Sequence, residues 1–312
     1  MKKEKHQGRI SQLGIYLGKY LRMFVYQNDW KVIPMSAIIA GVVTVVVGSN
    51  MFVTQEGTLT GTFALACVCL WNGVFNSIQV VCRERAILKR EHRAGLHVSS
   101  YLGAHMIYQF LLCLAQTGVT LFVCTMASVA FPRTGIITPW GIVDVGITIF
   151  LITYAADLMA LMVSCIVRDT TTAMTVMPFV LMFQLIFSGG FFGLSGAAEK
   201  ICNLTVSKWG LDSLCAIGRY NELPMVTLWN TIFKFKDIEI QGKKPLLDLI
   251  RYAQDNGYRD QFLLWSGQYN TKPNYAASVE NVLHNWGMIA LLGVVFVIIS
   301  WIALHSVDRD KR

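Results

Sequence analysis

Long stretches without charged residues recur along the chain and are separated by short polar segments. Residues 32–55 and 57–82 contain no Asp, Glu, Lys or Arg, and similarly apolar stretches follow at 101–126, 133–168, 170–198 and 281–307. A transmembrane helix needs about 20 mostly apolar residues, and lipid offers no partners for free backbone groups, so each stretch is expected to form a helix. The pattern therefore predicts an all-α polytopic membrane protein with six transmembrane helices.

Composition agrees with this class of protein. Of the 312 residues, 54% are hydrophobic and 15% are charged, whereas soluble domains carry about 25% charged residues. In a membrane protein the formal net charge of +8 indicates basic cytoplasmic loops facing anionic lipid rather than binding to nucleic acid. We therefore expect membrane lipid, and no nucleic acid, among the partners.

The distribution of basic residues predicts the orientation. If the N-terminus is cytoplasmic, sixteen Lys and Arg residues lie on the cytoplasmic side and the short outer loops hold only Arg133. This bias predicts that both termini lie in the cytoplasm. The expected divisions are a cytoplasmic N-terminus with a connecting helix, the first five spans, an extracytoplasmic segment, and the sixth span with a cytoplasmic tail, at residues 1–30, 31–194, 195–280 and 281–312.

Two segments outside the spans have patterns of their own. From Ile10 to Phe24, apolar residues recur at helical spacing, which predicts an amphipathic helix along the inner membrane surface, either an anchor or a mechanical element. In the outer segment, residues 195–223 are amphipathic and predict short re-entrant or interfacial helices. Residues 231–240 alternate as a short strand does, and amphipathic helices are expected after Pro245, so the cap has a mixed composition.

Signatures of catalysis are missing from the sequence. The chain contains neither a GxxxxGKS/T phosphate loop nor an HExxH or GxSxG motif, and its six histidines have no metal-ligand spacing. We therefore expect no enzyme activity, no catalytic residue, no metal and no cofactor bound by this chain itself.

The segment from Cys82 to Gly95 carries the strongest positive signal. Seven of its fourteen residues are charged, yet Ala86, Ile87 and Leu88 give it an apolar patch. A short cytoplasmic helix of this kind can dock into a groove of a partner protein, with its charges setting the register. A solvated turn that follows the positive-inside rule explains the composition equally well.

Three motifs then resemble one family. The first is an "ER…RE…G…Y" run that comprises Glu84-Arg85, Arg90-Glu91, Gly95 and Ser100-Tyr101. This run is similar to one in the permeases of the ABC efflux class. The eukaryotic relatives of these permeases include the G-subfamily drug and lipid half-transporters. The second is Val167-Arg168-Asp169 followed by Pro178, Gln184, Phe187-Ser188-Gly189 and Phe191-Phe192. The third runs from Ser207 to Asp212; here Val206-Ser207 replaces the family's Ser-Pro and Asp212 replaces its Glu. The resemblance covers residues 10–225 and the last span.

The resemblance implies a permease subunit of an ATP-driven exporter, with ATP and Mg²⁺ bound by a separate ABC ATP-binding subunit. Residues 83–97 would form a coupling helix that seats on this subunit, and residues 10–29 would be the connecting helix beside it. The residues implied in coupling are Glu84, Arg85, Arg90, Glu91, Arg168 and Asp169. A second permease chain, identical or different, would complete a dimer, and a permease without its own ATPase points to a bacterial cytoplasmic membrane.

Polarity within the spans indicates a substrate path. Asn72, Asn76 and Gln79 fall at i, i+4 and i+7, so three amides lie on one helical face, where exposure to lipid would be costly. Cavity lining and structural hydrogen bonding both explain this face. The residues assigned to the path are Asn72, Phe75, Asn76 and Gln79, opposed by Thr175, Phe179, Met182 and Phe187 of the fifth span. Core packing is the competing interpretation of the opposing set.

Other groups also have two interpretations. Asp157, near the middle of the fourth span, is either a functional carboxylate or a protonated packing residue, and Asp144 is expected to reach towards water. Cys202 and Cys215 form a disulfide if their Cβ atoms approach each other. Two other functions therefore remain open: an ion-coupled secondary transporter that uses Asp157, and a scaffold or sensor that displays residues 225–275.

Overall fold

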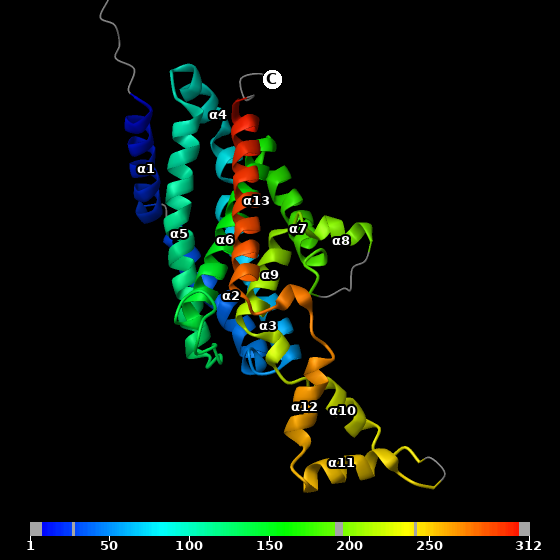
Figure 1. Ribbon diagram of the computed structural model, residues 1–312. Coiled ribbons are helices and arrows are strands. Elements are labelled where there is room, and N and C mark those ends of the chain that lie inside the picture. The colour runs from blue at the N-terminus through cyan, green and yellow to red at the C-terminus, as the bar shows by residue number, and fades with distance from the viewer. Residues whose placement is uncertain (1–7, 27–28, 191–195, 240–241, 306–312) are drawn as a thin grey trace, which may run out of the picture.

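The computed structural model describes residues 8–26, 29–190, 196–239 and 242–305, and within these ranges the regular elements are all helices (Figure 1). The long helices are α2 (Val32–Val47), α3 (Gln55–Ser77), α5 (Val98–Met126), α6 (Gly141–Ile166), α7 (Thr170–Ile186) and α13 (Val279–His305). The shorter ones are α1 (Arg9–Tyr26), α4 (Val80–Arg93), α8 (Ala197–Cys202), α9 (Val206–Ile217), α10 (Thr227–Lys234), α11 (Pro245–Asp255) and α12 (Arg259–Gln268).

Five helical segments of the described chain are long and apolar enough to cross a membrane. They are Val32–Asn50, Gln55–Arg93, Val98–Met126, Gly141–Ile166 and Val279–His305. The apolar helix α7 has 17 residues and so rises about 26 Å, against a hydrocarbon core of about 30 Å. The chain is therefore a multi-pass membrane protein, and the sixth span stays a prediction.

The central helix of the bundle is α6, which packs along α3 and α13. Eighteen of its 26 residues are buried. Gly73 allows α3 to approach closely, because a Cβ at this position would lie 2.2 Å from the carbonyl oxygen of Thr153. Small residues at such crossings are typical of transmembrane interfaces. This crossing brings the polar side chains of α3 and α6 together inside the bundle.

The amphipathic helix before the first span is α1, and it lies beside the first half of α5 (Figure 1). The hydroxyl of Ser100 donates to the carbonyl of Arg9 at 2.9 Å, and the ring of Tyr20 stacks on that of Tyr108 with centroids 5.7 Å apart. The two helices therefore run in the same direction. Aromatic side chains of α1 thus find partners on α5, and the expected position along the membrane surface stays a prediction.

In the described part of the cap at 195–280 the regular elements are helices, so the strand predicted at 231–240 is wrong for its described part. Residues 231–234 belong to α10. Trp229 and Ile232 lie three positions apart and pack together against buried residues of α11 and α12. That spacing gives one face of a helix, whereas a strand would turn the two side chains to opposite sides.

The first turn of α3 holds the cap to the bundle. The carboxylate of Glu56 accepts hydrogen bonds from the backbone N–H of Val226 at 2.9 Å and of Thr227 at 2.7 Å. The side-chain amide of Gln55 donates to the carbonyl of Gly267 at 3.0 Å. Gln55 and Glu56 thus bind both ends of the helical cap.

Asp144 is fully buried, which corrects the expectation that it reaches towards water. Its carboxylate accepts hydrogen bonds from the backbone N–H groups of Ile136, Ile137 and Thr138, at 2.6, 2.9 and 3.0 Å. The loop before α6 turns these three donors inward, and a carboxylate that accepts several N–H bonds is stable when buried. Asp144 therefore fixes the loop before α6 to that helix.

Candidate functional site

The predicted coupling helix corresponds to α4, and its neighbours fix both of its ends. At its start, the hydroxyl of Ser164 on α6 accepts hydrogen bonds from the N–H groups of Val81 and Cys82, at 3.1 and 3.3 Å. Such N-terminal groups have no partner within a helix. At its end, Gly95 has a φ of 105°, a conformation that glycine adopts readily, and the chain turns into α5. These contacts hold α4 in one orientation at the end of the bundle (Figure 1).

Two carboxylates of α4 point inward. Lys19 of α1 donates to Glu84 at 2.9 Å, and the hydroxyl of Tyr101 donates to the other oxygen of Glu84 at 3.3 Å. Glu91 accepts a hydrogen bond from the hydroxyl of Tyr16. Burial raises the pKa of Tyr16, and the hydrogen bond to Glu91 raises it further, so this phenol remains a donor at neutral pH. The two carboxylates therefore join α4 to α1 and α5.

Arg85 joins α4 to the turn between α6 and α7. Its guanidinium donates to the carbonyls of Cys165 at 3.0 Å and Val167 at 2.8 Å. Arg168 and Asp169 follow directly in this turn, and both are exposed. The carboxylate of Asp169 accepts from the N–H of Thr172 at 3.2 Å and so caps the start of α7. The structure thus places the two predicted coupling segments side by side.

A different set of residues occupies the exposed face of α4. Each of these residues lies three or four positions from another member of the set, so they form one stripe, which we call the outer stripe of α4: Arg83, Ala86, Ile87, Arg90 and Ala94. Ile87 is 44% exposed, whereas the neighbouring Leu88 is 2% exposed. Leu88 marks the inward face, because Glu84 precedes it by four positions and Glu91 follows it by three. The spacing of Glu84, Leu88 and Glu91 therefore indicates an inward position for both carboxylates, which the family motif did not predict.

The break between α3 and α4 divides the predicted amide face. Asn72 is buried on α3, and Asn76 exchanges two hydrogen bonds with Gln116 of α5, at 2.8 and 3.2 Å. Gln79 lies in the break and is not part of α3, so helical spacing does not extend to it. Phe75, Asn76 and Gln79 nevertheless line one cavity of about 210 Å³ between α1, α3, α4 and α5.

The residues of the predicted opposing wall do not line the cavity of the amides. Thr175, Phe179 and Met182 are exposed on α7, and Phe187 is half-buried at its end. Phe179 lines a separate recess of about 330 Å³ together with Met159 of α6 and other apolar residues. Within one chain, the structure does not bring these side chains opposite the amides of α3.

Asp157 belongs to a buried polar chain that links three helices. The hydroxyl of Ser77 on α3 donates to the carboxylate of Asp157 at 2.5 Å. The hydroxyl oxygen of Ser77 also lies 3.0 Å from Nε2 of His105 on α5. Each of the three residues is at most 1% exposed. Sequence analysis singled out Asp157 but missed Ser77 and His105. The presence of a histidine within an apolar span was the available signal.

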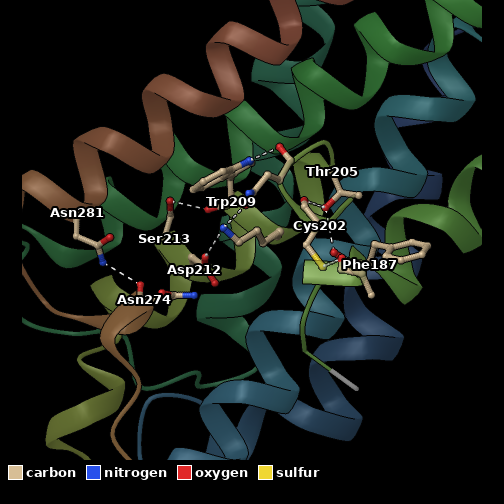
Figure 2. A network of polar contacts seen from close by, with 11 residues as sticks. Phe187, Cys202, Thr205, Trp209, Asp212, Ser213, Asn274 and Asn281 are labelled. Carbon is tan, nitrogen blue, oxygen red and sulfur yellow. Dashed lines mark hydrogen bonds and ion pairs between the residues drawn. The ribbon is translucent and has the colours of Figure 1, made fainter. Parts of the chain in front are cut away.

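The third family-like motif lies on α9, which packs against α3, α6 and α13 (Figure 2). The ammonium of Lys208 lies 3.7 Å from the carboxylate of Asp212 and 3.5 Å from the centre of the Trp209 ring. The Trp209 indole donates to the carbonyl of Asn203 at 3.0 Å. Burial raises the pKa of Asp212 to about 7, although Lys208 acts in the opposite direction. The motif therefore has a structural network of its own.

The structure does not bring the predicted disulfide together. Cys202 and Cys215 are free thiols; Cys202 donates to the carbonyl of Ala198 at 3.2 Å, and Cys215 lies 3.3 Å from the hydroxyl of Thr62 on α3. The two thiols therefore face different surroundings. The motif residues Phe191-Phe192 and the basic residues in 1–7 and 306–312 lie outside the described residues.

Comparison with known families follows the same part of the chain. Residues 19–217, from within α1 to the end of α9, match the family described as "ABC-2 type transporter". The chain belongs to the ABC-2 type transporter family. An ABC-2 domain is the transmembrane component of an ABC transporter and not a nucleotide-binding domain, and permeases of this family typically pair with an ATP-binding subunit.

This ABC-2 permease is also similar to a larger protein. The ABC transporter ATP-binding/permease protein Rv1747 of Mycobacterium tuberculosis (strain ATCC 25618 / H37Rv) is 26% identical to it over 153 residues. The similarity covers 46% of this chain and 17% of that relative. The ABC-2 permease therefore spans a small part of the relative's length.

Proposed function

We propose that this ABC-2 permease is the membrane subunit of an ATP-driven exporter and couples through α4 to a separate ATP-binding subunit. The observation that carries the proposal is the outer stripe of α4, in which Arg83 and Arg90 flank the exposed Ile87. A helix with one apolar anchor between two cations fits a groove with an apolar floor and acidic edges. The relative named as both ATP-binding protein and permease supports this pairing.

The predicted coupling residues take two roles in this proposal. Arg90 lies on the outer stripe and contacts the ATP-binding subunit. Glu84, Arg85 and Glu91 instead bind the chain's own helices, so they pass a movement of α4 to α1, α5 and the turn before α7. ATP and Mg²⁺ are held by the partner, and hydrolysis there moves α4.

A second permease chain completes the path in this proposal. The exposed aromatic and aliphatic side chains of α7 and the exposed Phe75 of α3 lie outside the packed core of one chain. When two chains meet through these helices, Phe179 and Met182 of one chain oppose the α3 residues of the other. Two bundles joined in this way can alternate between two packings, as a coupled transporter requires. The charge bias of the loops supports a cytoplasmic position for α4 and for both termini, in a bacterial cytoplasmic membrane.

Substitutions on the outer stripe test the coupling. We expect the double variant Ile87→Asp, Arg90→Glu to lose at least about 90% of co-purification with the ATP-binding subunit, because loss of an anchor and reversal of a charge cost about 2 kcal/mol or more at an interface. Tagged permease from its native host and the ATPase activity of the purified complex provide the measurement. The matched control is Arg259→Glu on the exposed surface of α12.

Two results would contradict the coupling proposal. One is the recovery of wild-type amounts of an active ATPase with the double variant. The other is the absence of any ABC ATP-binding protein from complexes of the wild-type permease. The control variant should behave as the wild type does, which separates a local effect at α4 from a general effect of surface charge.

A further inference from the structure

The cavity between α1, α3, α4 and α5 contains buried polar atoms that the described residues leave without partners. Its lining includes Arg83 and Glu84 of α4, and Asn76, His105 and Gln109 deeper in the bundle. Among the described residues, nothing hydrogen-bonds to Nδ1 of His105 or to Oε1 of Gln109. Unpaired buried polar atoms are costly, and a polar cavity of about 210 Å³ has room for several waters at about 30 Å³ each. His105 therefore lies at the boundary between this cavity and the buried interior of the bundle.

From His105 a continuous chain of hydrogen-bonding atoms leads to the middle of the bundle. Nε2 of His105 lies 3.0 Å from Oγ of Ser77, and this Oγ lies 2.5 Å from Oδ1 of Asp157. The three side chains come from α5, α3 and α6, and each is at most 1% exposed. The chain therefore connects the cavity with a carboxylate that water does not reach directly.

The surroundings of Asp157 hold no compensating positive charge among the described residues. Its titratable neighbours are Cys113 on α5 and Tyr154 on its own helix, and in the described part of the chain its carboxylate accepts a hydrogen bond from Ser77. The second oxygen, Oδ2, has no partner in the described part of the chain. An unpaired carboxylate buried in this way is far more stable when it carries a proton.

The surroundings of His105 place the charged groups at the cavity mouth. Tyr20 of α1 and Tyr108 of α5 are its aromatic neighbours. The charged side chains on the cavity lining are Arg83 and Glu84, and Glu84 is paired with Lys19. The inner part of the path is therefore neutral, and protons are the ions that its hydrogen bonds can carry.

We propose that Asp157 is a proton-binding site that is loaded from this cavity through His105 and Ser77. When Asp157 is ionised, Ser77 donates to Oδ1, Nε2–H of His105 donates to Ser77, and Nδ1 is the acceptor that no described residue uses. A hydronium ion in the cavity gives a proton to Nδ1. Nε2 then passes its proton to Oγ of Ser77, and Ser77 passes its own proton to Oδ1. One proton has moved from water to the carboxylate, and both hydrogen bonds have reversed direction.

The same path unloads the site by the reverse steps, so no other reactant is needed. At the end of loading, His105 is neutral with its proton on Nδ1, and Asp157 is a neutral acid. The change takes place at the crossing of α3 and α6, where Gly73 permits very close packing. The charge of Asp157 at this crossing therefore depends on the pH on the cavity side. Any movement of α3 relative to α6 thus depends on whether Asp157 carries a proton.

Infrared spectroscopy of the full-length chain in lipid nanodiscs tests this proposal. We expect an absorption band of a protonated carboxylic acid that disappears in Asp157→Asn and shifts when H₂O is exchanged for D₂O. In His105→Leu and in Ser77→Ala the band persists, but its exchange is slower by at least about tenfold, a barrier increase of about 1.4 kcal/mol. Ser77→Thr retains the hydroxyl and should retain fast exchange.

Matched variants outside the path control for loss of a histidine or a buried hydroxyl. His284→Leu removes an exposed histidine of α13, and Ser300→Ala removes a buried hydroxyl that bonds to the carbonyl of Phe296. Both should exchange as the wild type does. His105→Gln provides a second relay variant that keeps polar atoms at the site and should also exchange slowly.

Either of two results would overturn the proposal. The first is the absence of a carboxylic acid band sensitive to Asp157→Asn across the pH range in which the protein is folded. The second is exchange in Ser77→Ala and His105→Gln that is as fast as in the wild type. The measurement includes no ATP-binding subunit, so its outcome is independent of the coupling through α4.

Discussion

Lys208 and Asp212 show how burial changes the behaviour of a charged pair in this permease. Asp212 is 5% exposed, and burial raises its pKa from an ordinary value of 3.8 to about 7, even though Lys208 lies 3.7 Å away. Between these two pKa values the folded chain holds a proton that the unfolded chain has released. The free energy of unfolding therefore falls as the pH rises from about 4 to about 7 and is level above that.

The variant Asp212→Asn removes this pH dependence. We expect its apparent melting temperature in detergent, relative to that of the wild type, to rise between pH 5 and pH 7, because the wild type loses up to about 1.4 kcal/mol per pH unit in this range. The exposed Asp248 of α11 provides the control variant Asp248→Asn, whose melting curve should follow the wild type at every pH. Parallel pH profiles of Asp212→Asn and the wild type would contradict the expected effect.

At the scale of elements, α1 and α4 are joined by two carboxylates that the sequence motif assigned to a partner. Glu84 binds Lys19, and Glu91 binds Tyr16. We expect the double variant Glu84→Gln, Glu91→Gln to increase amide hydrogen exchange in α1 by about tenfold, because replacing each charge-assisted hydrogen bond by a neutral one costs about 0.7 kcal/mol when partly exposed. Hydrogen-exchange mass spectrometry measures this directly. The double control Glu199→Gln, Glu239→Gln changes two exposed carboxylates. Equal exchange in both double variants would show that Glu84 and Glu91 do not hold α1 to α4.

The apolar stretches predicted the long helices well, because transfer into lipid depends on composition over about 20 residues and little on tertiary contacts. Accordingly α2 and α6 lie within the predicted stretches, α3 and α13 each begin two residues earlier, and α5 begins three residues earlier, at Val98. The break before α4 could not be predicted in this way. It depends on the hydroxyl of Ser164, about 80 positions away, which replaces the helix's own acceptors.

The candidate site was predictable only in part for the same reason. Asp157 stands out because it is a lone acid in an apolar stretch, but its link to His105 depends on how α3, α5 and α6 cross. Ser77 and His105 are 28 positions apart, and Ser77 and Asp157 are 80 apart. No spacing rule joins them. The inward face of α4 could have been predicted from the sequence, because Leu88 lies between Glu84 and Glu91 on one face of the helix.

At the scale of the whole molecule, α3 connects the two ends of the bundle (Figure 1). Its first turn binds the cap through Gln55 and Glu56, and its last turn leads through the break into α4. Along its length it packs against α6, α2 and α9. A displacement of α4 therefore has a direct structural route to the cap, and α3 is also the helix that carries Ser77.

The position of a second permease chain provides the last test. Phe179 is 69% exposed on α7, and Ile302 is 57% exposed on α13. If both side chains contacted only lipid, cysteines at the two positions would cross-link to the same extent. If Phe179 of one chain opposes α3 of the other, oxidation of membranes that contain the double variant Phe75→Cys, Phe179→Cys should give a cross-linked dimer, while Phe75→Cys, Ile302→Cys should stay monomeric, because a disulfide forms only when the Cα atoms lie within about 7 Å. Denaturing electrophoresis without reductant distinguishes the two. A product containing another polypeptide would identify a heterodimer. Equal cross-linking at both positions would show that contact between chains is not confined to α7. That result would remove the basis for placing the substrate path between α3 and α7.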